Sequence, residues 1–138
     1  MTRIRRLGPG DEAAVLGAPG LFDEPPKPDA TRRFLAESTH HLLLAEDEGV
    51  AVGFVSGVET THPDKGTEMF LSELSVDEPA RRRGVGRALV EALAALARER
   101  GCFGMWVGTE PVNEAARRTY AAAGGRETPA HVIVEWEL

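Results

Sequence analysis

A glycine-containing turn with four arginines is the clearest candidate site for chemistry in this sequence. It runs Arg81-Arg82-Arg83-Gly84-Val85-Gly86-Arg87, between an apolar stretch at 70–76 and a helical pattern at 88–100. Glycine lets the backbone approach a ligand closely, and the first N–H groups of a helix have no intrahelical partner. Together with the helix dipole and the arginines, these groups predict an anion site, with a pyrophosphate as the expected guest. The alternative is a capped helix that follows a solvated basic turn.

Glu73 is the second candidate, because it is a carboxylate in a stretch that is otherwise typical of a central strand. Strand alternation predicts one face with Phe70, Ser72, Leu74 and Val76, and the other with Met69, Leu71, Glu73 and Ser75. Burial of an unpartnered carboxylate raises its pKa, and a raised pKa is what a general base near neutral pH requires. A solvated carboxylate at a splayed strand end, or a partner for an arginine, is the alternative.

The third candidate lies on the last predicted helix, over 114–123. Asn113 precedes this helix as an N-cap, and two glycines follow it as a terminator. The spacing Asn113-x-x-Ala116-x-x-x-Tyr120 places Ala116 and Tyr120 one turn apart on the same face of the helix.

A strand, a helix and a second strand must position these three candidates. The helix carries an apolar stripe formed by Val85, Ala88, Leu89, Ala92, Leu93 and Leu96. It ends at Gly101, and the apolar run 103–107 predicts a buried strand parallel to the strand over 70–76. This strand-helix-strand unit would carry the basic turn at its mouth.

The first half of the chain predicts antiparallel strands and two short helices. The predicted elements are strands over 2–7, 41–45, 51–58 and 67–76, and helices over 12–16 and 31–37, the second capped by Asp29. An acidic turn at 46–49 would close a hairpin. The segment 17–29 is rich in glycine, proline and acid, and is either a surface loop or the rim of a substrate site. In the second case Phe22, Asp23 and Glu24 would contact a cationic ligand.

Composition predicts one globular domain over 1–138, with 42% hydrophobic and 28% charged residues. The net charge of −6 argues against a general nucleic-acid binder, whereas a basic turn in an acidic body suits an anionic cofactor and a cationic substrate. Cys102 is the lone cysteine and the four histidines lack metal-ligand spacing, so we expect no metal site. Without a signal-like start or a stretch of transmembrane length, we expect a cytoplasmic protein that does not bind membranes.

Two of these motifs resemble signatures of the GNAT N-acetyltransferases. Residues 81–86 match the acetyl-CoA motif Q/R-x-x-G-x-G/A at each fixed position, and Asn113-x-x-Ala116-x-x-x-Tyr120 resembles the second signature. The resemblance implies an α/β fold, with a mixed sheet of six or seven strands, about four helices, and strands splayed around the acetyl-CoA. The implied cofactor-binding residues are Leu74, Ser75, Val76, Arg81, Arg82, Arg83, Gly84, Val85, Gly86, Arg87, Asn113, Ala116 and Tyr120.

The resemblance also implies a mechanism in which an amine attacks the acetyl thioester directly. Tyr120 would be the general acid near the thioester sulfur, and Glu73 would be the general base, acting through water. A backbone N–H near Ser75 or Val76 would stabilise the oxyanion. His41 and Glu110 are the next candidates for the base, and a core aromatic with a hydrogen-bonded hydroxyl is the alternative role for Tyr120.

The stretches at 71–76, 81–86, 21–24 and 134–138 resemble, within this family, the aminoglycoside 3-N-acetyltransferases. The carboxylates that could surround a polycation are Asp23, Glu24, Glu73, Glu110, Glu135 and Glu137, although such a surface is also an ordinary solvated one. An acetyltransferase for another small amine, polyamine or peptide N-terminus is the second hypothesis. A non-catalytic acyl-CoA-binding module is the third. A homodimer is a family-level expectation, because residues 131–138 could add a strand to their own sheet or to a partner's.

Overall fold

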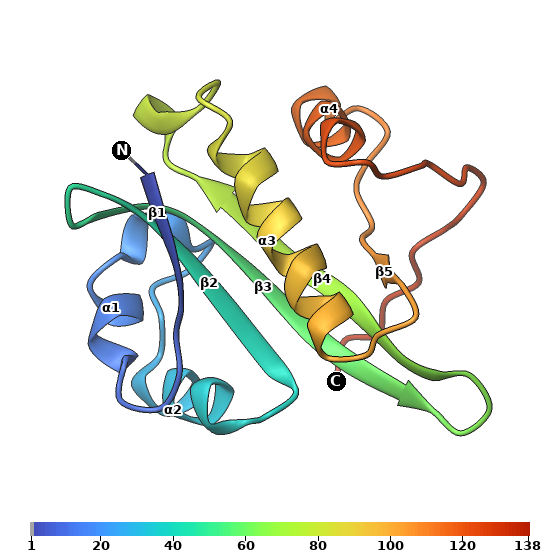
Figure 1. The fold of residues 1–138 in the computed structure, drawn as a ribbon, viewed down its shortest axis with the longest axis horizontal. Coiled ribbons are helices and arrows are strands. Elements are labelled where there is room, and N and C mark those ends of the chain that lie inside the picture. Colours follow the sequence, from blue (N-terminus) through green and yellow to red (C-terminus); the bar gives the residue numbers. More distant parts are fainter. Residues whose placement is uncertain (1) are drawn as a thin grey trace.

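Five strands form one mixed sheet in the order β1-β2-β3-β4-β5 in the computed structural model, which describes residues 2–138 (Figure 1). The strands are β1 (Thr2–Arg6), β2 (His40–Asp47), β3 (Val50–His62), β4 (Gly66–Val76) and β5 (Met105–Trp106). The helices are α1 (Glu12–Leu16), α2 (Pro28–Ala36), α3 (Val85–Glu99) and α4 (Glu114–Ala122), with 3₁₀ turns at Pro19–Leu21 and Glu78–Ala80. The predicted α/β class and the four helices are confirmed, but over residues 2–138 the sheet has five strands instead of six or seven.

Strands β1 to β4 pair antiparallel with their neighbours, and β5 pairs parallel with β4. Strands β2 and β3 form the predicted hairpin, which turns at Glu48 and Gly49 with φ values of 49° and 81°. Two consecutive positive φ values are typical of the turn whose twist matches that of the flanking strands. None of the helices between residues 2 and 138 has the length and apolar character that a membrane span requires.

The sheet separates two hydrophobic clusters, because alternate residues of β2 and β3 point to opposite faces. Leu43, Ala45 and Val55 pack under α3, together with Leu89 and Leu93 of that helix. The cluster on the other face, beside α1 and α2, contains Leu42, Leu44, Phe54, Val15 and Leu35. Figure 1 accordingly shows α1 and α2 on one side of the sheet and α3 on the other.

The predicted alternation of β4 is wrong beyond Leu71. Gly57 of β3 pairs with Leu71, but the next residue, Ser56, pairs with Glu73, so Ser72 is an extra residue in β4. Such a β-bulge reverses the faces of all later residues. Leu74 and Val76 consequently pack in the α3 cluster, with Met69 and Leu71, whereas Glu73 faces the α1–α2 side.

Strand β5 is shorter and more exposed than the predicted buried strand over 103–107. Its ladder contains only the pairs Met69–Met105 and Phe70–Trp106. Phe103 is 56% exposed and Trp106 is 52% exposed, although the Trp106 ring lies 4.5 Å from that of Phe70. The run of apolar residues resembled a strand buried on both faces, but only one of its faces is covered.

The segment 126–138 contains neither a helix nor a strand, so it adds nothing to the sheet of its own chain. Its exposed large hydrophobic residues are Val132, Ile133, Val134, Trp136 and Leu138. Pairing of this segment with a second copy of the chain stays a prediction.

Helix α2 begins at Pro28, three residues before the predicted start, and ends at Ala36. Proline is favoured at the first helical position because its fixed φ suits the helix and its missing N–H would have no partner there. Asp29 therefore lies within the first turn, where its Oδ1 accepts a hydrogen bond from Arg32 at 2.9 Å. The predicted N-cap role of Asp29 is wrong.

Candidate active site

Strands β4 and β5 diverge immediately after their two paired residues. Beyond Phe70 and Trp106 no further ladder pair joins them, so from Leu71 to Val76 the edge of β4 that faces β5 has no neighbouring strand, although the Val76 carbonyl accepts a hydrogen bond from Arg81 Nε. Unpaired backbone N–H and C=O groups at a strand edge are available for hydrogen bonds to an extended ligand. The predicted backbone contacts of Leu74, Ser75 and Val76 lie along this open edge.

The two glycines of the basic turn have different structural roles. Gly84 is the N-cap of α3 and has a φ of 79°, a conformation that glycine adopts without steric penalty. Gly86 lies in the first turn of α3, where an added Cβ would approach Thr119 Cγ2 of α4 to 3.3 Å and Val76 Cγ2 to 3.6 Å. The first glycine permits the turn, and the second permits close packing of α3 against α4 and the end of β4.

The start of α3 has the free donors that an anion site needs. The first hydrogen bond of the helix runs from the Ala88 N–H to the Gly84 carbonyl at 3.0 Å. The N–H groups of Val85, Gly86 and Arg87 therefore have no intrahelical acceptor, and they lie at the positive end of a 15-residue helix. These groups fit a pyrophosphate.

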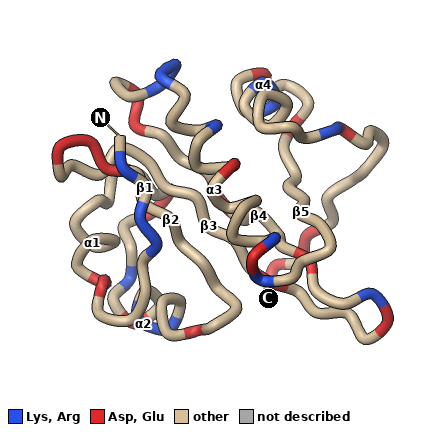
Figure 2. Tube along the Cα trace, viewed as in Figure 1, with Lys and Arg blue, Asp and Glu red and all other residues tan. Residues whose placement is uncertain are grey.

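Three of the four arginine side chains near this turn already have partners within the protein. Arg81 Nε donates to the Val76 carbonyl at 3.0 Å, Arg83 Nη2 lies 2.8 Å from Asp47 Oδ2, and Arg87 Nε lies 3.3 Å from Glu91 Oε1. The cluster is visible as the blue stretch before α3 in Figure 2. Arg82 is exposed, has a φ of 64°, and makes no side-chain hydrogen bond or ion pair to residues 2–138. Of the four, its guanidinium is the most available for a phosphate.

Helix α4 carries the remaining predicted cofactor residues. Asn113 is its N-cap, as predicted, and its Oδ1 accepts the Ala116 N–H at 3.1 Å, so Nδ2 is the end of this amide left for a ligand. Tyr120 is half-buried against the cluster under α3, and burial raises the pKa of its phenol. Its hydroxyl makes no hydrogen bond to the described residues, which argues against the alternative of a hydrogen-bonded core aromatic.

On the other face of the sheet, Glu73 lines a cavity of about 410 Å³ between β3, β4, α2 and residues 22–27. Phe22 and Phe54 form one wall, with ring centroids 4.3 Å apart and planes inclined by 24°. Segment 17–29 is therefore a cavity rim over residues 22–27, and its proline-rich part is continuous with α2.

Three carboxylates and one ammonium line this cavity, those of Asp23, Glu24, Glu73 and Lys27. Burial, and secondly the negative charge of Asp23, raise the pKa of Glu73. The other predicted substrate residues, Glu110, Glu135 and Glu137, are exposed and do not line it. Glu110 lies in the loop after β5, and the other two lie in the extended C-terminal segment, which the sequence could not place relative to the cavity.

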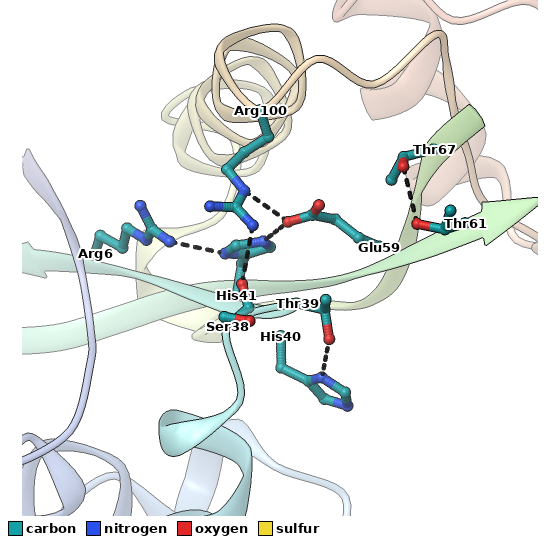
Figure 3. Close-up of polar contacts among 9 residues, drawn as sticks. All are labelled: Arg6, Ser38, Thr39, His40, His41, Glu59, Thr61, Thr67 and Arg100. Atoms are coloured by element: carbon teal, nitrogen blue, oxygen red, sulfur yellow. Dashed lines mark hydrogen bonds and ion pairs between the residues drawn. The ribbon is translucent and has the colours of Figure 1, made fainter.

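His41, one of the alternative bases, is fully buried away from this cavity and has both ring nitrogens bonded. Arg6 Nη2 lies 3.1 Å from Nδ1, and Glu59 Oε2 lies 2.5 Å from Nε2 (Figure 3). Because a guanidinium only donates, Nδ1 must accept, so the ring is neutral with its proton on Nε2. Arg100 completes the cluster, with Nε 2.7 Å from Glu59 Oε2. His41 therefore connects β1, β2 and β3 and is not a base for a substrate.

Acidification below about pH 6.5 is expected to destabilise the protein through His41. Burial is the largest cause that lowers the pKa of His41, so the unfolded chain binds a proton at a pH where the native state does not. Above the pKa of His41 in the unfolded chain, about 6.5, protonation of this residue does not lower the free energy of unfolding. As the pH falls from there toward the pKa in the native state, the free energy of unfolding decreases by at most about 1.4 kcal/mol per pH unit. Urea unfolding of the wild type and of His41→Gln between pH 7.5 and 5 measures this. His131→Gln, in the exposed C-terminal segment, is the control. If the free energy of unfolding of His41→Gln changed with pH as steeply as that of the wild type, the prediction would be contradicted.

Comparison with known proteins identifies the family. A sequence model of the acetyltransferase (GNAT) family matches residues 13–124, most of the chain. The chain belongs to the GNAT family. The open edge of β4, the free N–H groups of α3 and Tyr120 all lie within the matched GNAT region, and acetyl-CoA is the acetyl donor of this family.

Individual GNAT relatives support the same assignment. The probable N-acetyltransferase family 8 member 5 of Mus musculus is 30% identical over 112 residues, which are 78% of this chain and 49% of that protein. The aminoglycoside N(6')-acetyltransferase type 1 of Klebsiella aerogenes is 35% identical over 89 residues, 62% of this chain and 59% of that protein. The chain thus spans about a half of the first relative and about three fifths of the second.

A crystal structure of an aminoglycoside acetyltransferase from an uncultured soil metagenomic sample superposes on nearly the whole GNAT chain. Its TM-score is 0.84, at 25% sequence identity, and the match covers 99% of both chains. The two chains therefore share the same overall fold along nearly their whole length.

Among the residues that line the cavity, the sequence-based prediction missed Phe54 and Ser56 of β3. They lie two residues apart on β3 and so share a face, and the signal for them was available in this spacing. Their position opposite Glu73 depends on the bulge at Ser72, and nothing in the strand pattern predicted that bulge.

Proposed function

We propose that this protein transfers the acetyl group of acetyl-CoA to a primary amine of a small polycation held in the cavity, and that the acceptor is an aminoglycoside. The observation that carries the proposal is the cavity itself, with two stacked phenylalanines and three carboxylates against one lysine. Stacked rings accept the apolar face of a sugar or amino-cyclitol ring, and carboxylates bind its ammonium groups. Its volume lies within the range typical of small-molecule sites.

In this proposal the chain holds acetyl-CoA along the open edge of β4 and at the start of α3. Leu74, Ser75 and Val76 supply backbone groups to the extended arm, and the residues of the basic turn, Arg82 first, bind the phosphates. Asn113 and Ala116, which are joined by the cap hydrogen bond of α4, are the further residues proposed to bind the cofactor. When bound, acetyl-CoA supplies a thioester that an amine can attack. The Ser75 or Val76 N–H stabilises the negative charge that develops on the acetyl oxygen.

Glu73 and Tyr120 carry the proton transfers. Glu73, through a water molecule, would take a proton from the acceptor ammonium, and the freed amine could then form a bond to the acetyl carbon as the carbon–sulfur bond breaks. Tyr120 would give its phenolic proton to the departing sulfur, and the second proton that the nitrogen loses on becoming a neutral amide would restore the phenol. The raised pKa values of both groups suit these roles, since Glu73 accepts a proton more readily and Tyr120 stays protonated at neutral pH.

Thiol release from acetyl-CoA is the direct test, with kanamycin, spermine, 2,4-diaminobutyrate and an alanyl peptide as acceptors. We expect kcat/KM to be highest for kanamycin, and to fall as salt screens its ammonium groups. Preference for another amine would support the second hypothesis, an acetyltransferase for a different acceptor. Binding of acetyl-CoA without turnover of any amine would favour the third, a non-catalytic module.

The position of acetylation is a separate part of the proposal. The sequence predicts transfer to the 3-amino group, whereas the Klebsiella relative is named for transfer to the 6'-amino group. NMR of acetylated kanamycin distinguishes the two amino groups. Acetylation at the 6' position would leave the activity proposal intact and overturn the 3-N prediction.

A further inference from the structure

Ser56 of β3 has a buried hydroxyl group without a partner. The residue is 2% exposed, and its Oγ is the one buried side-chain nitrogen or oxygen within residues 2–138 that makes no hydrogen bond. A buried hydroxyl that lacks a hydrogen bond destabilises the folded state. Its neighbours on the strand, Val55 and Gly57, point to the opposite face and pack under α3, so the hydroxyl has no access to that side.

The position of Ser56 gives this hydroxyl a place in the cavity. Ser56 shares a face of β3 with Phe54, and both residues line the cavity. In the ladder between β3 and β4, Ser56 is the direct cross-strand partner of Glu73. Side chains directly opposite each other on one face of a sheet have Cβ atoms about 5 Å apart. The hydroxyl and the carboxylate make no hydrogen bond to each other, so both face the same part of the cavity with free acceptor capacity.

A primary ammonium group is the chemical group that fits these two acceptors. It has three N–H donors and no acceptor, and it carries the charge that the carboxylate attracts. A carboxylate or phosphate ligand would be repelled by Glu73 and by Asp23 beside it. An uncharged hydroxyl would satisfy Ser56 but would leave the Glu73 charge without a counter-charge.

We propose that Ser56 positions the reacting amine: its Oγ accepts one N–H of the acceptor ammonium while the Glu73 carboxylate, directly or through water, receives the proton from another. This inference rests on the proposed function, because it concerns the acceptor of that reaction. Ser56 is a positioning residue in this scheme and forms no bond to the acetyl group. Its hydroxyl is left without an internal partner because its partner arrives with the substrate.

The test compares Ser56→Ala and Ser56→Thr with the wild type, and uses Ser38→Ala as the matched control. Ser38 is exposed in the turn before β2 and does not line the cavity. Three quantities are measured: the Tm without ligand, the increase in Tm with kanamycin or with spermine, and the steady-state kinetics of acetylation. The kinetics are recorded across pH 6 to 9 to separate KM from kcat.

We expect Ser56→Ala to raise the Tm by a few degrees, because it removes an unsatisfied buried hydroxyl. We also expect a loss of about tenfold or more in kcat/KM for the amine, mostly through KM, and a smaller increase in Tm with ligand. KM for acetyl-CoA stays unchanged. Ser56→Thr keeps the hydroxyl and recovers most of the activity, and Ser38→Ala behaves as the wild type.

Two results would overturn the inference without touching the proposed function. One is an active Ser56→Ala protein with unchanged kcat/KM, pH profile and response to ligand. The other is a lower Tm for Ser56→Ala, which would show that the hydroxyl has a structural role. If the wild type neither acetylates nor binds any amine tested, the proposed function fails, and the inference about Ser56 fails with it.

Discussion

Replacement of Tyr120 by Phe is expected to lower kcat about a hundredfold, the usual contribution of one positioned proton donor, with little change in KM for acetyl-CoA. The variant keeps the ring, which packs under α3, and removes only a hydroxyl that makes no hydrogen bond to the described residues. Its free energy of unfolding should therefore stay within about 0.5 kcal/mol of the wild-type value. Steady-state kinetics and urea unfolding measure the two effects.

Tyr120 also offers a measurement that needs no substitution. It is the sole tyrosine of the chain, so the ultraviolet absorbance of tyrosinate reports its ionisation alone. Burial raises the pKa of this phenol, and we expect the transition above pH 10 in the folded protein. A Tyr120→Phe protein with unchanged kcat would remove the hydroxyl from the mechanism, whatever the titration shows.

Replacement of Glu73 by Gln is expected to lower kcat/KM for the amine by about a hundredfold or more at neutral pH, and to flatten the rise of activity with pH. In the wild type this limb follows ionisation of Glu73, whose pKa is raised by burial and by Asp23. The midpoint of this limb should therefore lie at a higher pH than the ordinary pKa of a glutamate. A pH profile of kcat/KM measures the effect.

Asp23→Asn is the matched control for this experiment. It removes a neighbouring negative charge but leaves the base in place, so the rising limb should persist and move to lower pH. If the limb survives unchanged in Glu73→Gln, the base lies elsewhere. His41 is already excluded by its buried bonds to Arg6 and Glu59, which leaves Glu110 as the remaining alternative.

Local sequence signals predicted much of the fold. Helix α1 has the predicted bounds, and α3 ends where Gly101, with a φ of 80°, leaves the helical conformation. The hairpin at Glu48 and Gly49 and the Asn113 cap were also predicted, because turns and caps depend on a few adjacent residues.

Features that depend on contacts between distant segments were predicted poorly. The length of β5 is set by how far it follows β4, and the apolar run at 103–107 carries no information about that divergence. Likewise, the sequence supplied four arginines at the basic turn, but the pairing of Arg83 with Asp47 arises from a hairpin 36 residues away. The candidate residues Asp23, Glu24 and Glu73 do meet at one cavity, whereas the C-terminal acids do not.

The bulge at Ser72 changes the side-chain alternation of β4, so residues before and after it follow opposite odd–even patterns. Up to Leu71 its odd-numbered residues support α3, whereas beyond the bulge Leu74 and Val76 support α3 and Glu73 lines the cavity. If Ser72 were instead accommodated in regular alternation, without the bulge, the Glu73 side chain would point into the hydrophobic cluster and Leu74 toward the cavity. The bulge at Ser72 is thus as much a determinant of the candidate site as the identity of Glu73.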